Sequence, residues 1–247
     1  MNKTTISIFI LPLLFLFSLP FSSIVFARED VPQERGSISF KLGLFRPDGD
    51  SHFWKETEEI FTFNSQDLKD LNVGVDFTTS INRILEFSIG VDYFHSSATS
   101  EYRDYIGDDG FPIVHDTVLE IIPVQATFKV LPGGRYTEGR RRLFLNKIIP
   151  YIGGGLGLYL WEYRETGEFI DFGDETLPIY YDSFFSDGVA VGAHALAGLE
   201  IAFDSNWSIL MEAKYNSVDD DLNNDFVDYG TIDLSGWNFT FGTSVRF

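Results

Sequence analysis

The sequence predicts an all-β fold, an eight-stranded antiparallel up-and-down transmembrane β-barrel. Residues Trp237 to Phe247 alternate between apolar and polar types, and successive side chains of a strand point to opposite faces. The sequence stops on an aromatic residue, a position where soluble domains usually carry a polar tail. After residue 27 no apolar window is long enough for a transmembrane helix, so a membrane crossing requires a closed barrel.

The first 27 residues have the pattern of a secretory signal peptide. Lys3 precedes an apolar run from Ile6 to Phe26, and we expect cleavage after Ala27. The alternative is a retained membrane helix, which Pro12 and Pro20 within the run disfavour. The absence of cysteine excludes a lipid-anchored lipoprotein. We therefore expect a signal peptide over 1–27 and an outer-membrane β-barrel over 28–247.

The composition of the remaining chain is strongly acidic. Of 18 basic residues one, Lys3, lies in the signal segment, which leaves 17 against 37 acidic residues and a net charge of −20. Such a charge argues against nucleic acid and anionic membrane surfaces as the main partner. Without cysteine there is no disulfide framework, so stability must come from burial or from the membrane.

Eight alternating segments of suitable length are separated by turn residues. The expected strands cover 37–45, 71–79, 85–95, 117–131, 150–163, 188–203, 207–217 and 237–247. Eight is the smallest even number found in outer-membrane barrels, and ten strands is the alternative. Pro123 inside the fourth segment predicts a β-bulge. Phe61 to Phe63 and Ile179 to Tyr181 are candidates for hairpins that extend the barrel beyond the membrane.

The connections predict which end of the barrel faces outward. Short ones lie near 80–84 and 204–206, and long acidic ones span 46–70, 96–116, 164–187 and 218–230. With both chain ends in the periplasm, the long connections face outside. The connection 132–149 falls on the periplasmic side and is basic. Its cluster Arg140 to Arg142 is expected either to contact phospholipid headgroups or to be an ordinary exposed turn.

The apolar faces are predicted to contact lipid. Trp161, Tyr215 and Trp237 lie near the outer ends of their strands, and Trp207 and Phe247 near the inner ends, a distribution typical of two aromatic girdles. Alternation alone does not say which face is inside, because a soluble lipocalin-like barrel would bury its apolar face. The signal segment, the girdles and the terminal Phe247 favour the membrane interpretation.

The polar faces are then predicted to line the lumen. The expected lumen charge network comprises Lys41, Asp76, Glu86, Asp92, Lys129, His194, Glu200, Glu212, Lys214 and Arg246, with Gln125 beside it. Charges of both signs in a narrow barrel must pair, because an unpaired buried charge is costly. The alternative is a gated polar path. Eight strands enclose an interior that side chains can fill, which disfavours a wide aqueous pore.

Two motifs carry a family resemblance. Ile122-Pro-Val-Gln-Ala-Thr-Phe128 and Pro150-Tyr-Ile-Gly-Gly-Gly-Leu-Gly157 resemble strands of small outer-membrane barrel proteins of the OmpW, OmpX and OmpA type. The pattern of Phe239, Phe241, Val245 and Phe247 resembles the barrel-assembly signal of such proteins. The resemblance implies the barrel fold. It leaves the function open, because the group includes hydrophobic-molecule channels, adhesion proteins and structural anchors.

An enzyme is the less expected reading. His95 and Ser97 resemble the outward-facing His–Ser pair of lipid A deacylase barrels, in which the His acts as base and the Ser as nucleophile. Here Ala98 stands where that motif has Asn, and no acid that could orient His95 is evident from the sequence. The alternative is a pair of interfacial polar residues at a strand end.

The segment Asp219 to Asp225 partly resembles a calcium loop. Asn224 stands in place of its glycine, and no Glu occupies the twelfth position, so a solvated acidic loop is favoured; bridging of loop acids to lipopolysaccharide phosphates by divalent ions is left open.

We expect no catalytic residue, cofactor or resident metal, and a monomer in the bacterial outer membrane. The predicted partners are outer-membrane lipids, lipopolysaccharide and the barrel-assembly machinery. The first functional hypothesis is a structural or surface-interaction protein with acidic external loops. The alternative is a narrow channel for small hydrophobic molecules, and a lipid A-modifying enzyme is the third.

Overall fold

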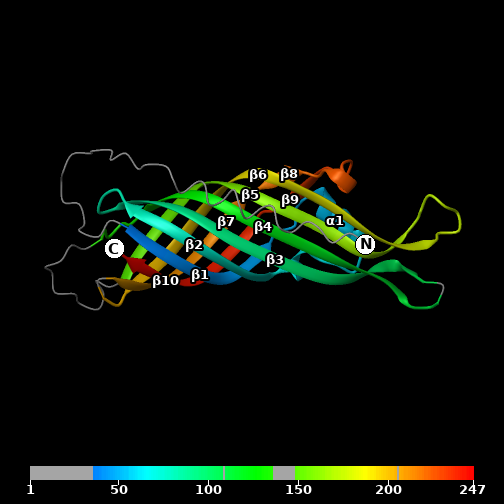
Figure 1. Cartoon of the computed structure of the whole chain (residues 1–247), viewed down its shortest axis with the longest axis horizontal. Coiled ribbons are helices and arrows are strands. Elements are labelled where there is room, and N and C mark those ends of the chain that lie inside the picture. The colour runs from blue at the N-terminus through cyan, green and yellow to red at the C-terminus, as the bar shows by residue number, and fades with distance from the viewer. Residues whose placement is uncertain (1–35, 108, 136–147, 205) are drawn as a thin grey trace, which may run out of the picture.

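In the computed structural model eight antiparallel strands close into a barrel, with neighbours in the order β1-β10-β7-β6-β5-β4-β3-β2 (Figure 1). The model describes residues 36–107, 109–135, 148–204 and 206–247. The barrel strands are β1 (Gly36–Pro47), β2 (Asp70–Ser80), β3 (Leu85–Ile106), β4 (Pro112–Val130), β5 (Ile148–Ile170), β6 (Ile179–Ala202), β7 (Trp207–Ser217) and β10 (Gly236–Arg246). The predicted eight-stranded barrel is confirmed, and the ten-strand alternative is wrong.

The barrel closes where β1 meets β10. These strands pair from Ser37–Arg246 to Pro47–Gly236. Gly36 and Phe247 complete the seam, each donating its backbone N–H to the carbonyl oxygen of the other, at 3.1 and 3.0 Å. The signal segment, its cleavage site and the Arg140–Arg142 cluster lie outside the described residues.

The exterior of the barrel carries a continuous apolar belt. Half or more of the side-chain surface is exposed at Phe40 (56%), Leu156 (64%) and Phe241 (50%), although all three are strongly apolar. The outward residues of β5 stay apolar or are glycine from Ile148 to Leu160. At a rise of about 3.3 Å per residue along the strand and a strand tilt of about 40°, this segment spans about 30 Å along the barrel axis. This height matches the hydrocarbon core of a bilayer, so the fold is a transmembrane β-barrel.

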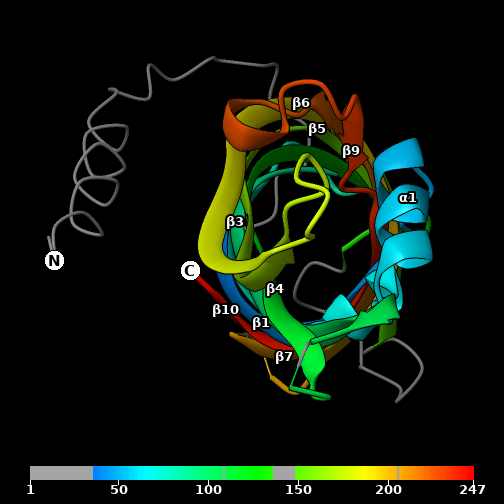
Figure 2. The same ribbon diagram turned by 90° about the vertical axis from the view of Figure 1, so that its right-hand side faces the viewer.

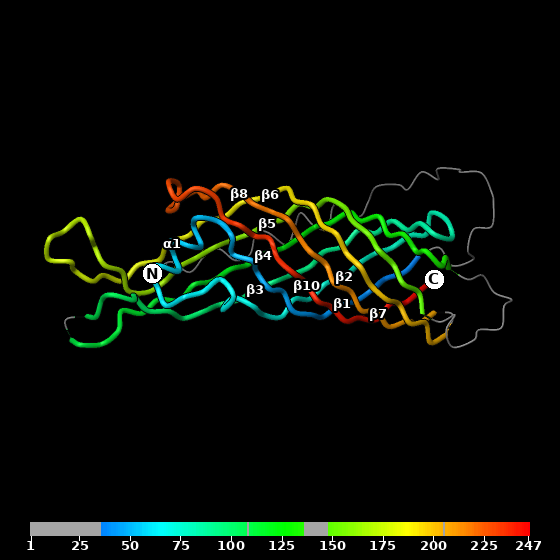
Figure 3. The backbone as a smooth tube through the Cα atoms, turned by 180° about the vertical axis from the view of Figure 1, so that it is seen from behind, coloured from blue at the N-terminus to red at the C-terminus, as the bar shows by residue number. Residues whose placement is uncertain are grey.

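Polar outward residues mark the upper edge of the belt. They are Arg46 on β1, His95 on β3, Glu120 on β4, Glu162 on β5 and Asp187 on β6. Beyond this edge β3, β4, β5 and β6 continue as two long hairpins, whereas β1, β2, β7 and β10 end (Figure 3). The expected hairpin at Ile179 to Tyr181 is confirmed. The expected long loops 96–116 and 164–187 are wrong, because regular strand pairing continues through most of both segments.

Shorter elements complete the wall above the four short strands. They are α1 (His52–Ile60), η2 (Ser65–Leu68), β8 (Asp219–Asp221), η4 (Asn224–Phe226) and β9 (Thr231–Asp233), in which β8 and β9 form a two-stranded sheet. Viewed along the barrel, α1 lies at one side of the mouth (Figure 2). The expected hairpin at Phe61 to Phe63 is wrong, since only one isolated bridge forms, between Phe61 and Tyr102.

Local sequence explains helix α1. Ser51 caps it by accepting a hydrogen bond from the backbone N–H of Trp54 at 3.4 Å. Phe53, Trp54 and Thr57 share its buried face, as the helical period requires. The Trp54 indole N–H donates to the carbonyl oxygen of Asp233 at 2.8 Å, which ties α1 to β9. No helix among the described residues is both long and apolar enough to cross a membrane.

Two predictions about strand detail are corrected. The bulge at Pro123 is wrong, because β4 keeps one register with β3 on both sides of it, and the register shift lies between Glu101 and Ile106 instead. Proline lacks the N–H donor, which removes a ladder bond without adding a residue. The girdle role of Trp161 is also wrong, because this side chain points inward and its indole N–H donates to Asp220 at 2.8 Å.

Candidate functional site

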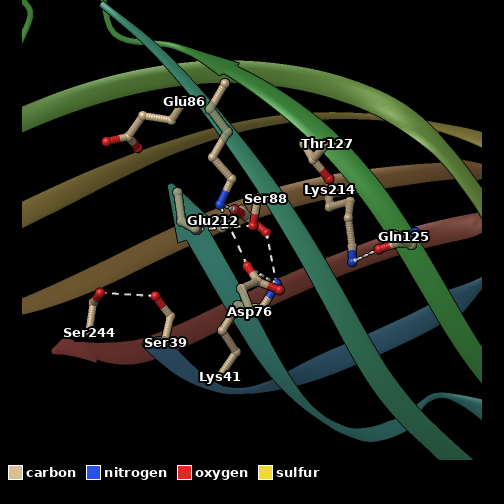
Figure 4. Close-up of polar contacts among 12 residues, drawn as sticks. Ser39, Lys41, Asp76, Glu86, Ser88, Gln125, Thr127, Glu212, Lys214 and Ser244 are labelled. Atoms are coloured by element: carbon tan, nitrogen blue, oxygen red, sulfur yellow. Dashed lines mark hydrogen bonds and ion pairs between the residues drawn. The ribbon is translucent and has the colours of Figure 1, made fainter. Parts of the chain in front are cut away.

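Six charged side chains meet inside the membrane-level part of the barrel, and Figure 4 labels four of them, Lys41, Asp76, Glu212 and Lys214. The Lys41 ammonium lies 3.0 Å from Asp76 and 3.4 Å from Glu212, and the Lys129 ammonium lies 3.5 and 3.7 Å from the same two carboxylates. Lys214 forms a close ion pair with Asp92. We call these six residues the central network. Its three lysines and three carboxylates balance in charge.

The central network crosses the lumen. In the ring order β7 and β3 stand opposite each other, and the Lys214–Asp92 pair joins them directly. Lys214 also donates to the Gln125 side-chain oxygen at 2.5 Å, and the Gln125 amide donates to Asn216 at 2.9 Å, which joins β4 to β7. Opposite walls are therefore cross-linked by side chains, as the narrow interior of an eight-stranded barrel permits.

A second balanced cluster lies nearer the end of the barrel that carries Gly36 and Phe247. Arg135 pairs with Glu86 and, at 2.9 Å, with Glu200, while Arg246 donates to both Glu200 oxygens at 2.7 and 2.8 Å. We call these four residues the lower cluster. Its two arginines and two glutamates also balance. Sequence reasoning assigned Arg135 to a periplasmic connection, yet its side chain turns into the barrel and is buried.

All ten residues of the expected lumen charge network face inward, and nine belong to these two groups. The tenth, His194, is a member of neither and forms a 2.8 Å hydrogen bond with the Thr127 hydroxyl through Nε2, while its Nδ1 atom has no partner among the described residues. Of the expected assembly signal, Phe239, Phe241 and Val245 lie on the outward face of β10, and Phe247, one residue beyond its end, is exposed.

Near the upper edge of the belt and beyond it, the interior changes from charged to aromatic. Phe45, Phe94, Tyr159 and Tyr163 are inward-facing and buried, and rings from α1 and η4 pack onto them. The Phe53 ring stands edge-on to Tyr163 at 5.1 Å and to Phe226 at 5.8 Å. The part of the barrel above the belt, which we call the external half after its expected orientation, thus has its own apolar core, distinct from the ionic interior below.

A cavity of ≈510 Å³ opens at the external end of this core. Its floor is buried and includes Phe53, Tyr102, Phe169 and Glu165. Its rim is exposed and includes Phe172, Tyr180 and Tyr229. Sequence reasoning missed this site, although a run of inward aromatic residues on the extended strands could have indicated it.

Glu165 is the buried charge-bearing group of this cavity. The Tyr163 hydroxyl donates to Oε1 of Glu165, and no ion pair joins this carboxyl to a Lys, Arg or His among the described residues. Burial raises the pKa of Glu165 to about 7, partly opposed by the hydrogen bond from Tyr163. The carboxyl therefore changes charge near neutral pH.

His115 lies in the same external half. Its Nε2 atom is 3.0 Å from the Ser100 hydroxyl, its ring packs 4.0 Å from that of Phe61, and its Nδ1 atom has no partner among the described residues. Burial lowers the pKa of His115 to about 4, with Asp116 opposing the shift. The imidazole is therefore neutral at physiological pH.

The structure corrects one expectation about His95. An acid does lie beside it, because β3 pairs with β4 so that His95 stands opposite Glu120, with Nδ1 and Oε2 3.5 Å apart. The Tyr93 hydroxyl donates to the same carboxylate oxygen at 3.1 Å. Ser97 is exposed on this outward face, but no hydrogen bond joins it to His95 among the described contacts. Cross-strand register, which a single strand does not reveal, brings Glu120 here.

The segment Asp219 to Asp225 does not form a calcium loop. Its first three residues are strand β8, paired with β9, and Asp225 accepts the backbone N–H of Phe185 at 3.0 Å. Among the described residues no group of three or more metal-ligating side chains is arranged to hold an ion.

No family model and no curated protein sequence matches this chain. Among solved structures the chain is similar to the outer membrane protein OprG from Pseudomonas aeruginosa, with 12% identity and a TM-score of 0.49, covering 88% of this chain and 99% of that one. It is also similar to Neisserial surface protein A, with 14% identity and a TM-score of 0.46, covering 86% and 96%.

The Escherichia coli outer membrane protein W is similar too, with 16% identity and a TM-score of 0.38, covering 87% of this chain and 100% of that one. These similarities carry no assignment of function. The class of protein follows from the closed ring and its apolar belt, which define a small transmembrane β-barrel with a filled membrane-level interior.

Proposed function

We propose that this chain is a monomeric bacterial outer-membrane protein with a structural and surface-interaction role. The observation that carries the proposal is the charge-balanced central network, because its Lys214–Asp92 pair joins opposite walls and fills the narrow lumen, with the balanced lower cluster beside it. The external half supplies a rigid, acidic surface. Export through a cleaved signal peptide at 1–27 belongs to the same proposal.

The proposed partners follow from the surfaces. Lipid tails contact the belt, and lipopolysaccharide surrounds the acidic external half, where divalent ions can bridge carboxylates to phosphates. The barrel-assembly machinery is proposed to read the last strand, whose Phe239, Phe241 and Val245 face outward.

The lumen proposal is tested by conductance. The purified, refolded protein is inserted in a planar bilayer, with an open porin as the positive control for insertion and recording. We expect no discrete conductance steps and no solute flux above protein-free liposomes. Reproducible steps from the wild-type protein would overturn the closed lumen.

The alternative function is a narrow channel for small hydrophobic molecules. The aromatic rings that line the external cavity favour capture of such molecules, whereas the central network below it opposes their passage. Uptake of a small apolar dye into liposomes separates the two functions, since a structural protein gives the rate of empty liposomes.

We further propose that the chain is not an enzyme. The His95–Glu120 pair is the arrangement closest to a catalytic one on the outward face, but His95 and Ser97 are not hydrogen-bonded and Ala98 offers no side-chain donor. The expected result is that lipid A from cells expressing the wild-type protein has the same acylation pattern as lipid A from cells expressing His95→Ala. A missing acyl chain that returns in the variant would establish a deacylase.

A further inference from the structure

The external cavity combines aromatic rings with negative charge. Its described lining contains four carboxylates, those of Glu56, Glu59, Glu165 and Asp225, and no Lys, Arg or His. Glu165 is buried at the floor, whereas Glu56, Glu59 and Asp225 are exposed near the opening. A neutral apolar molecule would gain nothing from these acids, and an anion would be repelled by them.

The rings are arranged so that several surround one space. Phe169 stands edge-on to Phe184 at 4.8 Å, Tyr102 lies beside Phe172 at 6.4 Å, and Phe226 stands edge-on to Tyr229 at 5.7 Å. They come from β3, β5, β6, η4 and the connections between them. Aromatic faces carry negative electrostatic potential and attract cations, most strongly when the cation is weakly hydrated.

The floor offers a specific partner for a positive charge. Oε1 of Glu165 accepts the Tyr163 hydroxyl hydrogen, and no cationic side chain among the described residues pairs with this carboxylate. A buried carboxylate without a cation is costly, and a bound cation would relieve that cost. The cavity volume of ≈510 Å³ lies within the range of about 300–1,000 Å³ that is usual for small-molecule sites.

We propose that this cavity binds a hydrophobic organic cation, of the aryl- or alkyl-ammonium class, with its charge beside Glu165 and its apolar groups against the rings. The inference is independent of the closed lumen, because the cavity opens at the external end and binding requires no passage through the barrel. This inference adds small-molecule binding to the proposed structural and surface-interaction role.

The binding is tested by calorimetry on the full barrel in nanodiscs of zwitterionic lipid, with protein-free nanodiscs subtracted. The probes are benzyltriethylammonium, the neutral N,N-diethylbenzamide and the anion benzenesulfonate. We expect measurable binding of the ammonium, weaker binding of the amide by about tenfold or more, and none of the sulfonate. Equal binding of the ammonium and the amide would show an apolar pocket only and overturn the proposal, as would no binding of the ammonium.

Two variants separate a charge effect from a loss of folding. Glu165→Gln keeps the size of the side chain and is expected to weaken ammonium binding by about tenfold or more while leaving amide binding unchanged. The matched control is Glu168→Gln, on the same strand but facing outward, which should alter neither affinity. Folding of each variant is checked by its heat-dependent gel mobility. A folded Glu165→Gln variant with wild-type affinity for the ammonium contradicts the site.

Acidity provides a further readout. Protonation of Glu165 removes its charge, so ammonium binding should strengthen as the pH rises from about 6 to about 8 and the Glu165→Gln variant should lose most of this dependence. The other titratable and polar groups that face Glu165 are Tyr163 on β5, Thr117 on β4, Tyr102 on β3, Tyr180 on β6, Glu56 and Glu59 on α1, Asp225 in η4, and Tyr229. A dependence that survives intact in Glu165→Gln would assign the effect to those groups and overturn the role of Glu165.

Discussion

At the scale of single residues, the interior of the barrel is governed by the cost of unpaired charge. Lys214 and Asp92 are both almost completely buried, and they join opposite walls. Removing one partner of such a pair leaves the other uncompensated, whereas removing both leaves the charge balanced. The second carboxylate oxygen of Asp92 has only Lys41 nearby, at 3.9 Å, so Lys214 is its main partner.

We therefore expect Lys214→Met to destabilise the barrel by about 3–5 kcal/mol. The double variant Lys214→Met with Asp92→Asn should be less destabilised than that single variant, because the central network is neutral again. The measurement is the free energy of unfolding in lipid vesicles from denaturant titration. Arg164→Met, at an exposed pair with Glu162, is the control and should change stability by about 0.5 kcal/mol or less. A double variant less stable than Lys214→Met would contradict the charge-balance account.

At the scale of elements, the external half is held together by packing that the sequence indicated only in part. The alternation along β5 indicates the two faces of the strand. Every second residue faces inward throughout, first Gly153, Gly155 and Gly157 and then Tyr159, Trp161 and Tyr163. Alternation reports the face of a strand but not the depth at which it leaves the membrane. For that reason the change from ionic to aromatic interior was not predicted.

The same limit explains the other missed features. Helix α1 depends on Phe53 and Trp54 finding an aromatic core that only the folded barrel assembles. Glu120 meets His95 because of the register between two strands, and Arg135 meets Glu86 because of the path of a connection. Neither the register nor the path can be read from one segment. By contrast, the outward faces and the inward placement of the ten charged or imidazole side chains follow from local alternation, which can be read from a single segment.

The external half also contains two titratable groups with opposite pH dependence. The pKa of His115 is lowered to about 4, so stability is lost as the pH falls from about 6.5 toward 4. The pKa of Glu165 is raised to about 7, so stability is lost as the pH rises from about 4.5 toward 7. In the wild-type protein these two effects oppose each other.

Separate variants should reveal both slopes. Between pH 4.5 and 6.5, Glu165→Gln should become less stable on acidification, and His115→Asn should become less stable on alkalinisation, each by up to about 3 kcal/mol over its full range. The measurement is the denaturant midpoint for proteolysis of the external half in vesicles at several pH values. Slopes of the same sign in both variants would contradict the assignment of the two pKa shifts.

At the scale of the whole molecule, the apolar belt determines where the barrel is stable. Leu156 and Tyr181 are similarly exposed, at 64% and 74%, but Leu156 lies within the belt and Tyr181 lies on the external hairpin. In water the two positions would tolerate a charge equally. In a bilayer an arginine near the midplane costs about 2–4 kcal/mol, and outside the membrane it costs almost nothing.

Leu156→Arg is accordingly expected to lower the free energy of unfolding in vesicles by about 2–4 kcal/mol, and Tyr181→Arg to leave it within about 0.5 kcal/mol. Both variants are refolded into vesicles and followed by denaturant titration with the wild type alongside. Equal effects of the two substitutions would contradict the interpretation that the belt contacts the hydrocarbon core of a bilayer.

The seam between β1 and β10 has a consequence for the order of assembly. The other barrel pairings join strands that follow one another in the sequence, so those hairpins form over short sequence distances. The pairing of β7 with β10 differs only in that β8 and β9 lie between the two strands in the sequence. The pairing of β1 with β10, completed by Gly36 and Phe247, requires the two far ends of the described chain to find each other, at the largest loop-closure cost among the barrel pairings. A circular permutant that links these extremities and opens at the tip near Thr176 would convert this slowest contact into a local one, and its rate of closure in vesicles should rise.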